Sequence, residues 1–264
     1  MIYFSDLLLQ QFSDEATAIS EVLNTYQVSH QYLSHTKDIW VRDFMPVQTR
    51  TGQYIAFRYE PSYLKEDPEL RTDFFHDIAP QLTVDIIQSN INLDGGNIVF
   101  SPSKERVIIS DRVFLENPEY SAAELIRQLC MLLEAEVIII PSLKSDFTGH
   151  ADGMIRFIDE NTAVGNDLPS KDGLEQRIKR VLLYHGIDVI DFPYQQAKGI
   201  SALGSYINYL ETESYIFLPT FGIDMDEYAV AQARQILPKT VVPIHVREIS
   251  QHGGCLNCIS WENQ

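Results

Sequence analysis

The sequence predicts an α/β fold made of five similar units, each about fifty residues long. Helix-like stretches alternate with short strand-like runs, which is typical of the α/β class. Turn-like positions recur at intervals of 51, 58, 52 and 50 residues, and most precede a hairpin-like strand pair, a helix and another strand. If five such units closed around an axis, five equivalent loops would meet at its centre. These positions are Asp43, Asp94, Asp152, Gly204 and Gly254.

Apolar residues at helical spacing predict five helices. Three carry a recognisable start or stop signal: Ser121 with Glu124 forms a capping-box pattern, Gly186 ends the fourth helix, and Pro238 follows the fifth. The predicted helices lie at 14–26, 70–78, 121–133, 174–185 and about 226–236. Six strand-like runs lie between or beside them, at 54–59, 107–110, 137–140, 187–190, 215–218 and 241–244.

The composition limits the class of protein. With 264 residues, of which 45% are hydrophobic, the chain can bury a full core, and we expect residues 1–264 to form one domain. The net charge of −17 disfavours a nucleic-acid partner, because such binding needs a basic surface. Three cysteines, no secretory signal and no long apolar run predict a cytoplasmic protein without a membrane partner. The sequence leaves a homo-oligomer possible.

Three short motifs bring together residue types that can carry chemistry. His150 and Asp152 lie two residues apart between Gly149 and Gly153, so their side chains point the same way in an extended segment. Such a pair suits a proton-transfer histidine beside an anionic clamp, although an isolated pair is more often a solvated loop. The second motif is Trp40-Val41-Arg42-Asp43, in which Arg42 and Asp43 could equally form a surface ion pair. The third is Asp94-Gly95-Gly96-Asn97, which could equally be an ordinary hairpin turn.

The segment His252–Ser260 is the most informative, because two glycines lead into Cys255 and Cys258. A C-x-x-C pair is compatible with zinc or redox chemistry, but no second ligand pair has zinc spacing. A thioredoxin-like site would follow the first strand of a βαβ unit. The two glycines therefore suit a nucleophilic cysteine in this segment, and the family resemblance given next implies that it is Cys258 and that Cys255 is structural. We expect Cys130 to be a core residue.

These motifs together resemble the agmatine deiminase and bacterial peptidylarginine deiminase family of the guanidino-group modifying superfamily. In order, they are Trp-x-Arg-Asp, acidic-Gly-Gly-Asn, Gly-His-x-Asp followed by Arg-Phe, and Gly-Gly-x-x-x-Cys. The resemblance runs from about Asp38 to Ser260 and includes Gly204–Tyr209, which looks like the family's Tyr/Asn-bearing strand. It implies a five-bladed α/β propeller, the pentein fold, of ββαβ repeats with pseudo-fivefold symmetry.

The roles that the resemblance implies fit a planar guanidinium, whose N–H groups pair with carboxylates. Asp43 and Asp152 match the substrate clamp, and Cys258 matches the nucleophile that attacks the central carbon. His150 matches the general acid that protonates the departing ammonia and then activates water. Asp94 matches the acidic residue that orients this histidine. Trp40, Arg42 and Asn208 are further expected substrate contacts. No metal or organic cofactor is required, and the expected partner is a small guanidinium compound.

Departures from the family pattern leave the substrate open. Asn257 stands where agmatine deiminases usually have histidine, and their Trp-rich N-terminal stretch has no counterpart here. Agmatine, giving N-carbamoylputrescine, is the leading candidate. Free arginine would need a cation such as Arg42, Arg58 or Arg156 for its carboxylate, and peptidyl-arginine would need an open cleft. An amidinotransferase and a non-catalytic pentein-fold binding protein are the remaining alternatives.

Overall fold

The computed structural model describes residues 1–144, 146–167 and 173–263, and their strands form five three-stranded sheets. Each sheet has one plan: a short first strand is antiparallel to a middle strand, which is parallel to a third. Four of them are β3 (Val47–Gln48), β4 (Tyr54–Arg58), β5 (Ile86–Asn92); β6 (Val99–Phe100), β7 (Arg106–Ser110), β8 (Glu136–Ile140); β9 (Ile155–Phe157), β10 (Thr162–Asn166), β11 (Asp188–Phe192); β12 (Leu210–Glu211), β13 (Tyr215–Thr220), β14 (Thr240–His245).

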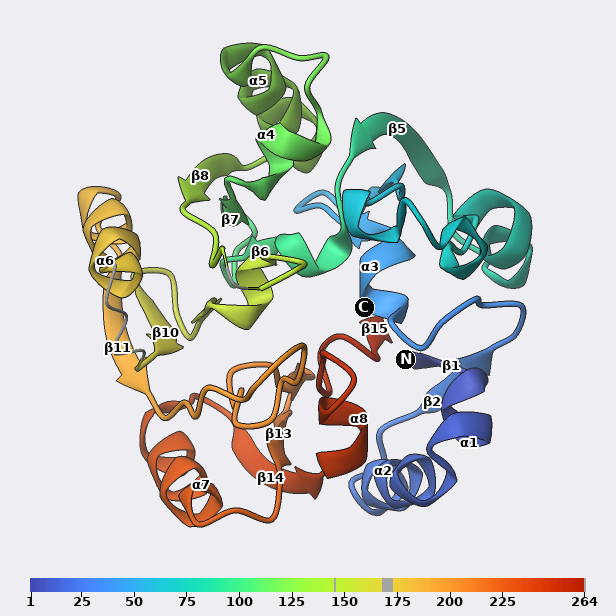
Figure 1. Cartoon of the computed structure of the whole chain (residues 1–264), viewed down its shortest axis with the longest axis vertical. Helices are drawn as coiled ribbons and strands as arrows, with labels where there is room; N and C mark the ends of the chain where they lie inside the picture. The colour runs from blue at the N-terminus through green and yellow to red at the C-terminus, as the bar shows by residue number, and fades with distance from the viewer. Residues whose placement is uncertain (145, 168–172, 264) are drawn as a thin grey trace.

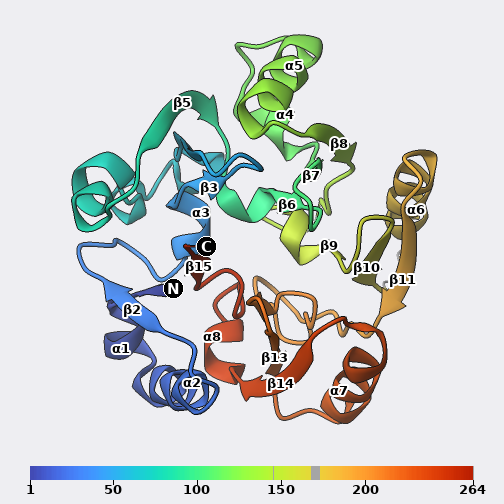
Figure 2. The same ribbon diagram turned by 180° about the vertical axis from the view of Figure 1, so that it is seen from behind.

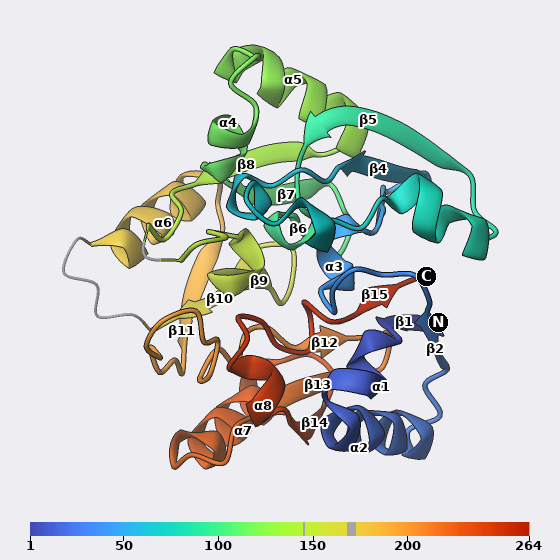
Figure 3. The same ribbon diagram turned by 45° about the vertical axis from the view of Figure 1, so that its right-hand side comes forward.

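The fifth sheet joins the two ends of the chain. Its first strand, β15 (Trp261–Glu262), pairs antiparallel with β1 (Ile2–Ser5), which pairs parallel with β2 (His30–Leu33). The rings of Tyr3 and Trp261, which face each other in this pairing, lie 5.3 Å apart. Both termini consequently lie side by side in every view (Figure 1, Figure 3).

Helices supply four of the five crossovers that parallel middle and third strands require. The four longest lie at the periphery, while the first strands of the sheets lie near the centre (Figure 1, and from behind in Figure 2). They are α2 (Ser13–Thr25), α5 (Ala122–Leu133), α6 (Leu174–Tyr184) and α7 (Met225–Ile236). Shorter helices are α1 (Leu7–Gln11), α3 (Val41–Phe44), α4 (Arg112–Glu116) and α8 (Arg247–Ser250). None of these described helices combines the length and apolar character needed to cross a lipid bilayer.

Four of the five predicted helices are confirmed as α2, α5, α6 and α7. Ser121 caps α5 as predicted, since its Oγ accepts a hydrogen bond from the Glu124 N–H at 3.3 Å. Leu125, Leu129 and Leu133 on the same helix are fully buried against the sheet below. Cys130 of α5 is half-buried, so its predicted core position is only partly correct.

The predicted helix at 70–78 is wrong, because the β4–β5 crossover has no α-helix. It consists of short 3₁₀ and π turns separated by extended residues. Asp73 is extended, and its side chain accepts the His76 N–H at 3.1 Å, so a new turn starts there. Pro80 has no N–H for a longer helix. The turns are η1 (Ser62–Leu64), η2 (Pro68–Leu70), η3 (Phe74–Ile78) and η4 (Ala79–Gln81).

All six predicted strands are present as β4, β7, β8, β11, β13 and β14, with ends within two residues of the prediction. The short first strands, together with β1, β2 and β5, were not predicted. A strand of two or three residues, such as β3 or β15, is too short to show an alternating pattern.

Each of the five recurring turn-like positions lies in a segment that leads into the first strand of a sheet. Asp43 lies in α3 before β3, Asp94 precedes η5 (Gly95–Asn97) and β6, and Asp152 lies in η6 (Ala151–Gly153) before β9. Gly204 and Gly254 come before β12 and β15. The fifty-residue spacing in the sequence therefore corresponds to the five sheets, and these lead-in segments face the centre.

Candidate active site

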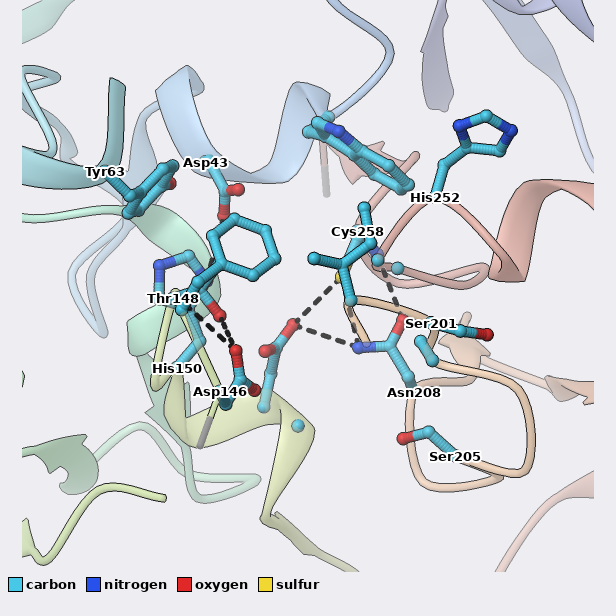
Figure 4. A pocket seen from close by; sticks show the side chains of 18 of the residues that line it. Asp43, Tyr63, Asp146, Thr148, His150, Ser201, Ser205, Asn208, His252 and Cys258 are labelled. Atoms are coloured by element: carbon cyan, nitrogen blue, oxygen red, sulfur yellow. Dashed lines mark hydrogen bonds and ion pairs between the residues drawn. The ribbon is translucent and has the colours of Figure 1, made fainter. Parts of the chain in front are cut away.

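Four of the five lead-in segments, all but that of Asp94, line a cavity of about 380 Å³. Six of the predicted site residues line it: Trp40, Asp43, His150, Asp152, Asn208 and Cys258. They come from four different sheet units, and Figure 4 shows the labelled ones facing a common space. The predicted thiol and the predicted imidazole, 108 residues apart in sequence, thus share one cavity.

His150 lies between two carboxylates. Its Nε2 is 2.8 Å from Asp94 Oδ2 and its Nδ1 is 3.5 Å from Asp43 Oδ1. Burial opposes a charge on this imidazole, but Asp43 and Asp94 outweigh burial and raise the pKa of His150 to about 10. The raised pKa favours the imidazolium form, which carries a proton that it can donate.

Asp43 is held by the neighbouring lead-in segment. Its Oδ1 accepts the Gly96 N–H at 3.1 Å. A Cβ at Gly96 would lie 2.6 Å from both Asp43 Oδ1 and His150 Nδ1, so only glycine permits this approach. Burial raises the pKa of Asp43 to about 8, and the charge of His150 works against that increase. A cation that entered the cavity would favour the ionised carboxylate.

The thiol of Cys258 lies between an amide and an acid. Its Sγ accepts a hydrogen bond from Asn208 Nδ2 at 3.2 Å, and the S–H points to Asp152 Oδ2 at 3.7 Å. Burial, together with the charges of Asp152 and Asp43, raises the pKa of Cys258 well above its usual value. This raised pKa favours the neutral thiol, and a positive charge beside it would lower that pKa.

Asn208 fixes the loop that carries this thiol. Its Oδ1 accepts the backbone N–H groups of Cys255 at 3.1 Å and of Cys258 at 3.3 Å. Its Nδ2 also reaches Asp152 Oδ2 at 3.3 Å. One buried amide thus sets the positions of both the thiol and a carboxylate, a role that the motif alone did not indicate.

Asn257, the departure from the family pattern, also contacts Asp152. Its Nδ2 donates to Asp152 Oδ2 at 2.6 Å, so this oxygen has two amide donors and the thiol around it. Cys255 is fully buried, and its S–H points to the Ala202 carbonyl at 3.6 Å, which fits the predicted structural role.

Replacing Gly254 with alanine is expected to lower the free energy of unfolding by about 1–3 kcal/mol. A Cβ there would lie 2.5 Å from the Trp40 ring and 2.8 Å from Cys258 Cβ. Urea unfolding measures the change. Gly153→Ala is the matched control, because Gly153 lines the same cavity and its Cβ would have no neighbour within 4 Å. Equal stability of the two variants would contradict the close packing of Trp40 on this loop.

None of the three arginines considered for a substrate carboxylate lines the cavity. Arg42, which was also an expected substrate contact, pairs with Glu262 at 2.7 Å and donates to the Asn257 carbonyl at 3.3 Å. Arg58 pairs with Glu119 at 3.3 Å. Arg156 lies over the Tyr209 ring at 4.5 Å and reaches Glu211 at 3.4 Å. Arg42 therefore supports the loop of Cys258 from behind.

The cavity also has acidic and aromatic residues that the sequence did not single out. Asp38 and Asp146 line it, and among the described lining residues there is no lysine or arginine. Burial raises the pKa of Asp38 to about 7, although the Trp40 N–H donates to its Oδ1 at 3.0 Å. Asp38 lies two residues before Trp40, so its closeness to the Trp-x-Arg-Asp motif could have identified it as a site residue from the sequence. Tyr59, Tyr63, Phe147 and Tyr194 are the aromatic residues.

The described residues include no group of three or more histidine, cysteine, aspartate or glutamate side chains arranged to hold a metal ion. The chemistry that these described residues offer is that of a thiol, an imidazole and several carboxylates around one small cavity.

Comparison with known proteins gives a family and a fold. A model of the Porphyromonas-type peptidyl-arginine deiminase family matches residues 6–263. The agmatine deiminase of Pseudomonas fluorescens is 30% identical over 76 residues, 28% of this chain and 21% of that protein. The chain thus matches about a fifth of the length of its curated relatives.

Two solved structures share the fold over almost the whole chain. The agmatine deiminase of Enterococcus faecalis has a TM-score of 0.77 at 18% identity, covering 98% of this chain and 92% of that one. The agmatine deiminase of C. jejuni, a variant solved with substrate bound, has a TM-score of 0.73 at 15% identity, with the same coverage of 98% and 92%.

Proposed function

Because the chain belongs to the Porphyromonas-type peptidyl-arginine deiminase family, we propose that it hydrolyses the guanidinium group of a small molecule and that this molecule is agmatine. The observation that carries the proposal is the shared cavity of Cys258 and His150 with the carboxylates of Asp43 and Asp152. A planar cation that pairs with both carboxylates brings its central carbon to the thiol.

The proposed reaction has two steps. The bound guanidinium pairs with Asp43 and Asp152, and its charge lowers the pKa of the Cys258 thiol. The Cys258 S–H bond breaks and its proton passes to solvent, and the resulting thiolate forms a C–S bond. His150 protonates the departing nitrogen, and the C–N bond breaks to release ammonia. A water molecule then attacks the thiouronium carbon while His150 takes its proton. The C–S bond breaks, and a ureido product leaves with the thiol restored.

Supporting residues hold this arrangement. Asp94 keeps His150 oriented at 2.8 Å. Asn208 holds the Cys258 backbone at 3.3 Å and the thiol at 3.2 Å. Trp40 lines the cavity beside the Cys258 loop, where a ring face suits a flat cation. Arg42 acts through the Asn257 carbonyl rather than on the substrate.

The charges around the cavity favour a substrate with a cationic tail. Besides the two clamp acids, Asp38 and Asp146 line the cavity, and no described lining residue offers a positive side chain to a carboxylate. The tail of agmatine is an ammonium, which these acids attract. The α-carboxylate of arginine would lie beside like charges, which costs several kcal/mol.

With purified protein, we expect kcat/KM for agmatine to exceed that for free arginine by about 100-fold or more, because like charges repel the arginine carboxylate. Ammonia release measured against agmatine, arginine and a capped arginine peptide tests this. Arginine amide is a useful control, since it keeps the arginine skeleton without the carboxylate and should recover part of the loss. Faster ammonia release from arginine than from agmatine would contradict the proposal that the cavity prefers a substrate with a cationic tail.

We also propose that residues 1–264 act as one domain and that the five sheets are blades of an α/β propeller with pseudo-fivefold symmetry. The common strand order of the five sheets supports this interpretation. So does the likeness to the agmatine deiminase structures, which covers 98% of the chain.

A further inference from the structure

The β4–β5 crossover, residues 59–85, differs from the crossovers between the middle and third strands of the other four sheets. The peripheral helices α2, α5, α6 and α7 contribute no residue to the lining of the cavity. The β4–β5 crossover lacks such a helix and sends Tyr59, Tyr63, Leu64 and Leu70 into that lining. This segment therefore covers the cavity from one side.

Tyr63 is the residue of this crossover that reaches the polar cluster. Its hydroxyl donates to Asp94 Oδ2 at 2.9 Å. The same oxygen is 2.8 Å from His150 Nε2, so one carboxylate oxygen accepts from both a phenol and an imidazole. The Tyr63 ring lies 6.2 Å from the His150 ring, and Figure 4 shows the two side chains on the same side of the cavity.

Contacts on both sides of the phenol hold it in place. The ring of Tyr63 packs edge-to-face on Phe147 at 5.4 Å, with an interplanar angle of 89°. The preceding residue, Ser62, donates through its N–H and its hydroxyl to Glu116 at 2.9 and 2.7 Å. Glu116 is in turn paired with Arg112 at 2.7 Å. The hydroxyl is thus aimed at Asp94 by packing and by an anchor on α4.

We propose that Tyr63 is a positioning residue that sets the proton affinity of His150 by sharing the Asp94 carboxylate. Through this contact, the β4–β5 crossover that covers one side of the cavity influences the proton transfers of the reaction. This inference rests on the proposed deiminase function. The phenol withdraws charge from Asp94 Oδ2, so Asp94 stabilises the imidazolium less than an unshared carboxylate would. His150 then gives up its proton to departing ammonia more readily.

Several groups determine the charge of His150, and the proposal concerns one of them. Asp43 faces Nδ1 from α3, Asp94 faces Nε2, and Asp152 lies two residues away in η6. Burial and the charge of Asp94 raise the pKa of Tyr63 well above its usual value, so the phenol keeps its proton and remains a donor. The Tyr63 hydroxyl is the contact that can be removed without deleting a charge.

The test is the Tyr63→Phe variant, followed by NMR titration of ¹⁵N-labelled histidine, with His150→Gln used to assign the His150 signals. Without the phenol, Asp94 Oδ2 carries more charge, and the His150 pKa should rise by about half to one unit. This readout needs no activity, so it separates failure of the inference from failure of the proposed function. With agmatine, kcat should fall about 10-fold and KM should change by less than about threefold.

Two comparisons complete the experiment. Tyr194→Phe makes the same chemical change in another tyrosine of the cavity lining and should leave the His150 titration unchanged. In an Asp94→Asn background, Tyr63→Phe should cause no further shift, because both act through one oxygen. An unchanged or lowered His150 pKa in Tyr63→Phe, or an equal shift in Tyr194→Phe, would overturn the inference.

Discussion

Cys258→Ala is expected to reduce ammonia release from agmatine by about 10⁴-fold or more, because none of the other described lining residues has a thiol that could form the C–S bond. Binding should survive, since Asp43 and Asp152 keep their positions in the lining. Ammonia assay and isothermal titration calorimetry measure the two quantities separately. Mass spectrometry of wild-type protein quenched during turnover should locate the thiouronium adduct on Cys258.

Cys255→Ala is the matched control for this variant. Cys255 is fully buried and contacts the Ala202 carbonyl, so its removal should change kcat by only a few-fold. Iodoacetamide should label Cys258 before the fully buried Cys255, faster as pH rises toward the high pKa of its thiol, and agmatine should protect it. Clear turnover by Cys258→Ala would end the proposed mechanism.

Asp94→Asn is expected to lower kcat by about 10⁴-fold while the protein still folds, as for the buried acid of hydrolytic triads. Asp94 Oδ2 accepts from both His150 Nε2 and the Tyr63 hydroxyl. An amide has no charge, and one of its orientations turns an NH₂ group toward these two donors. The imidazole loses a main source of its raised pKa and the contact that orients it.

The contrasting variant is Asp38→Asn. Asp38 lines the same cavity, but its carboxylate accepts the Trp40 N–H rather than orienting the imidazole. If Asp38 attracts the substrate tail, its amide should raise KM for agmatine about 10-fold and leave kcat within a few-fold. Steady-state kinetics and circular dichroism of both variants provide the comparison. A small kcat effect for Asp94→Asn would remove His150 from the proposed proton transfers.

Much of the fold could be predicted from local patterns. The helices that match prediction, such as α5 and α6, have full turns of apolar residues and a clear cap or terminal glycine. The failure at residues 70–78 has a local cause: four apolar residues had helical spacing, but Asp73 and Pro80 interrupt the backbone. The spacing of apolar side chains does not show where the backbone hydrogen bonds of a helix are interrupted.

The candidate site was predictable in its reactive groups and less so in its supports. Glycine-flanked motifs pointed to His150 and Cys258, and the structure places both in one cavity. The partners of Arg42 and Tyr63 were not predictable, because each contact joins residues that only the closed fold brings together. Arg42 meets Glu262, 220 residues away, and Tyr63 meets Asp94, which no motif connects with it.

The sheet shared by β15 and β1 has a consequence for when the thiol can react. Cys258 lies three residues before β15, so the docking of β15 on β1 helps to hold the loop that Asn208 positions. A nascent or nicked chain would carry all its reactive groups and still be inert toward guanidines. Conversely, a circular permutant that joins residues 1 and 264 and opens an exposed loop elsewhere should retain the arrangement of the reactive groups, because the two ends already lie side by side in one sheet.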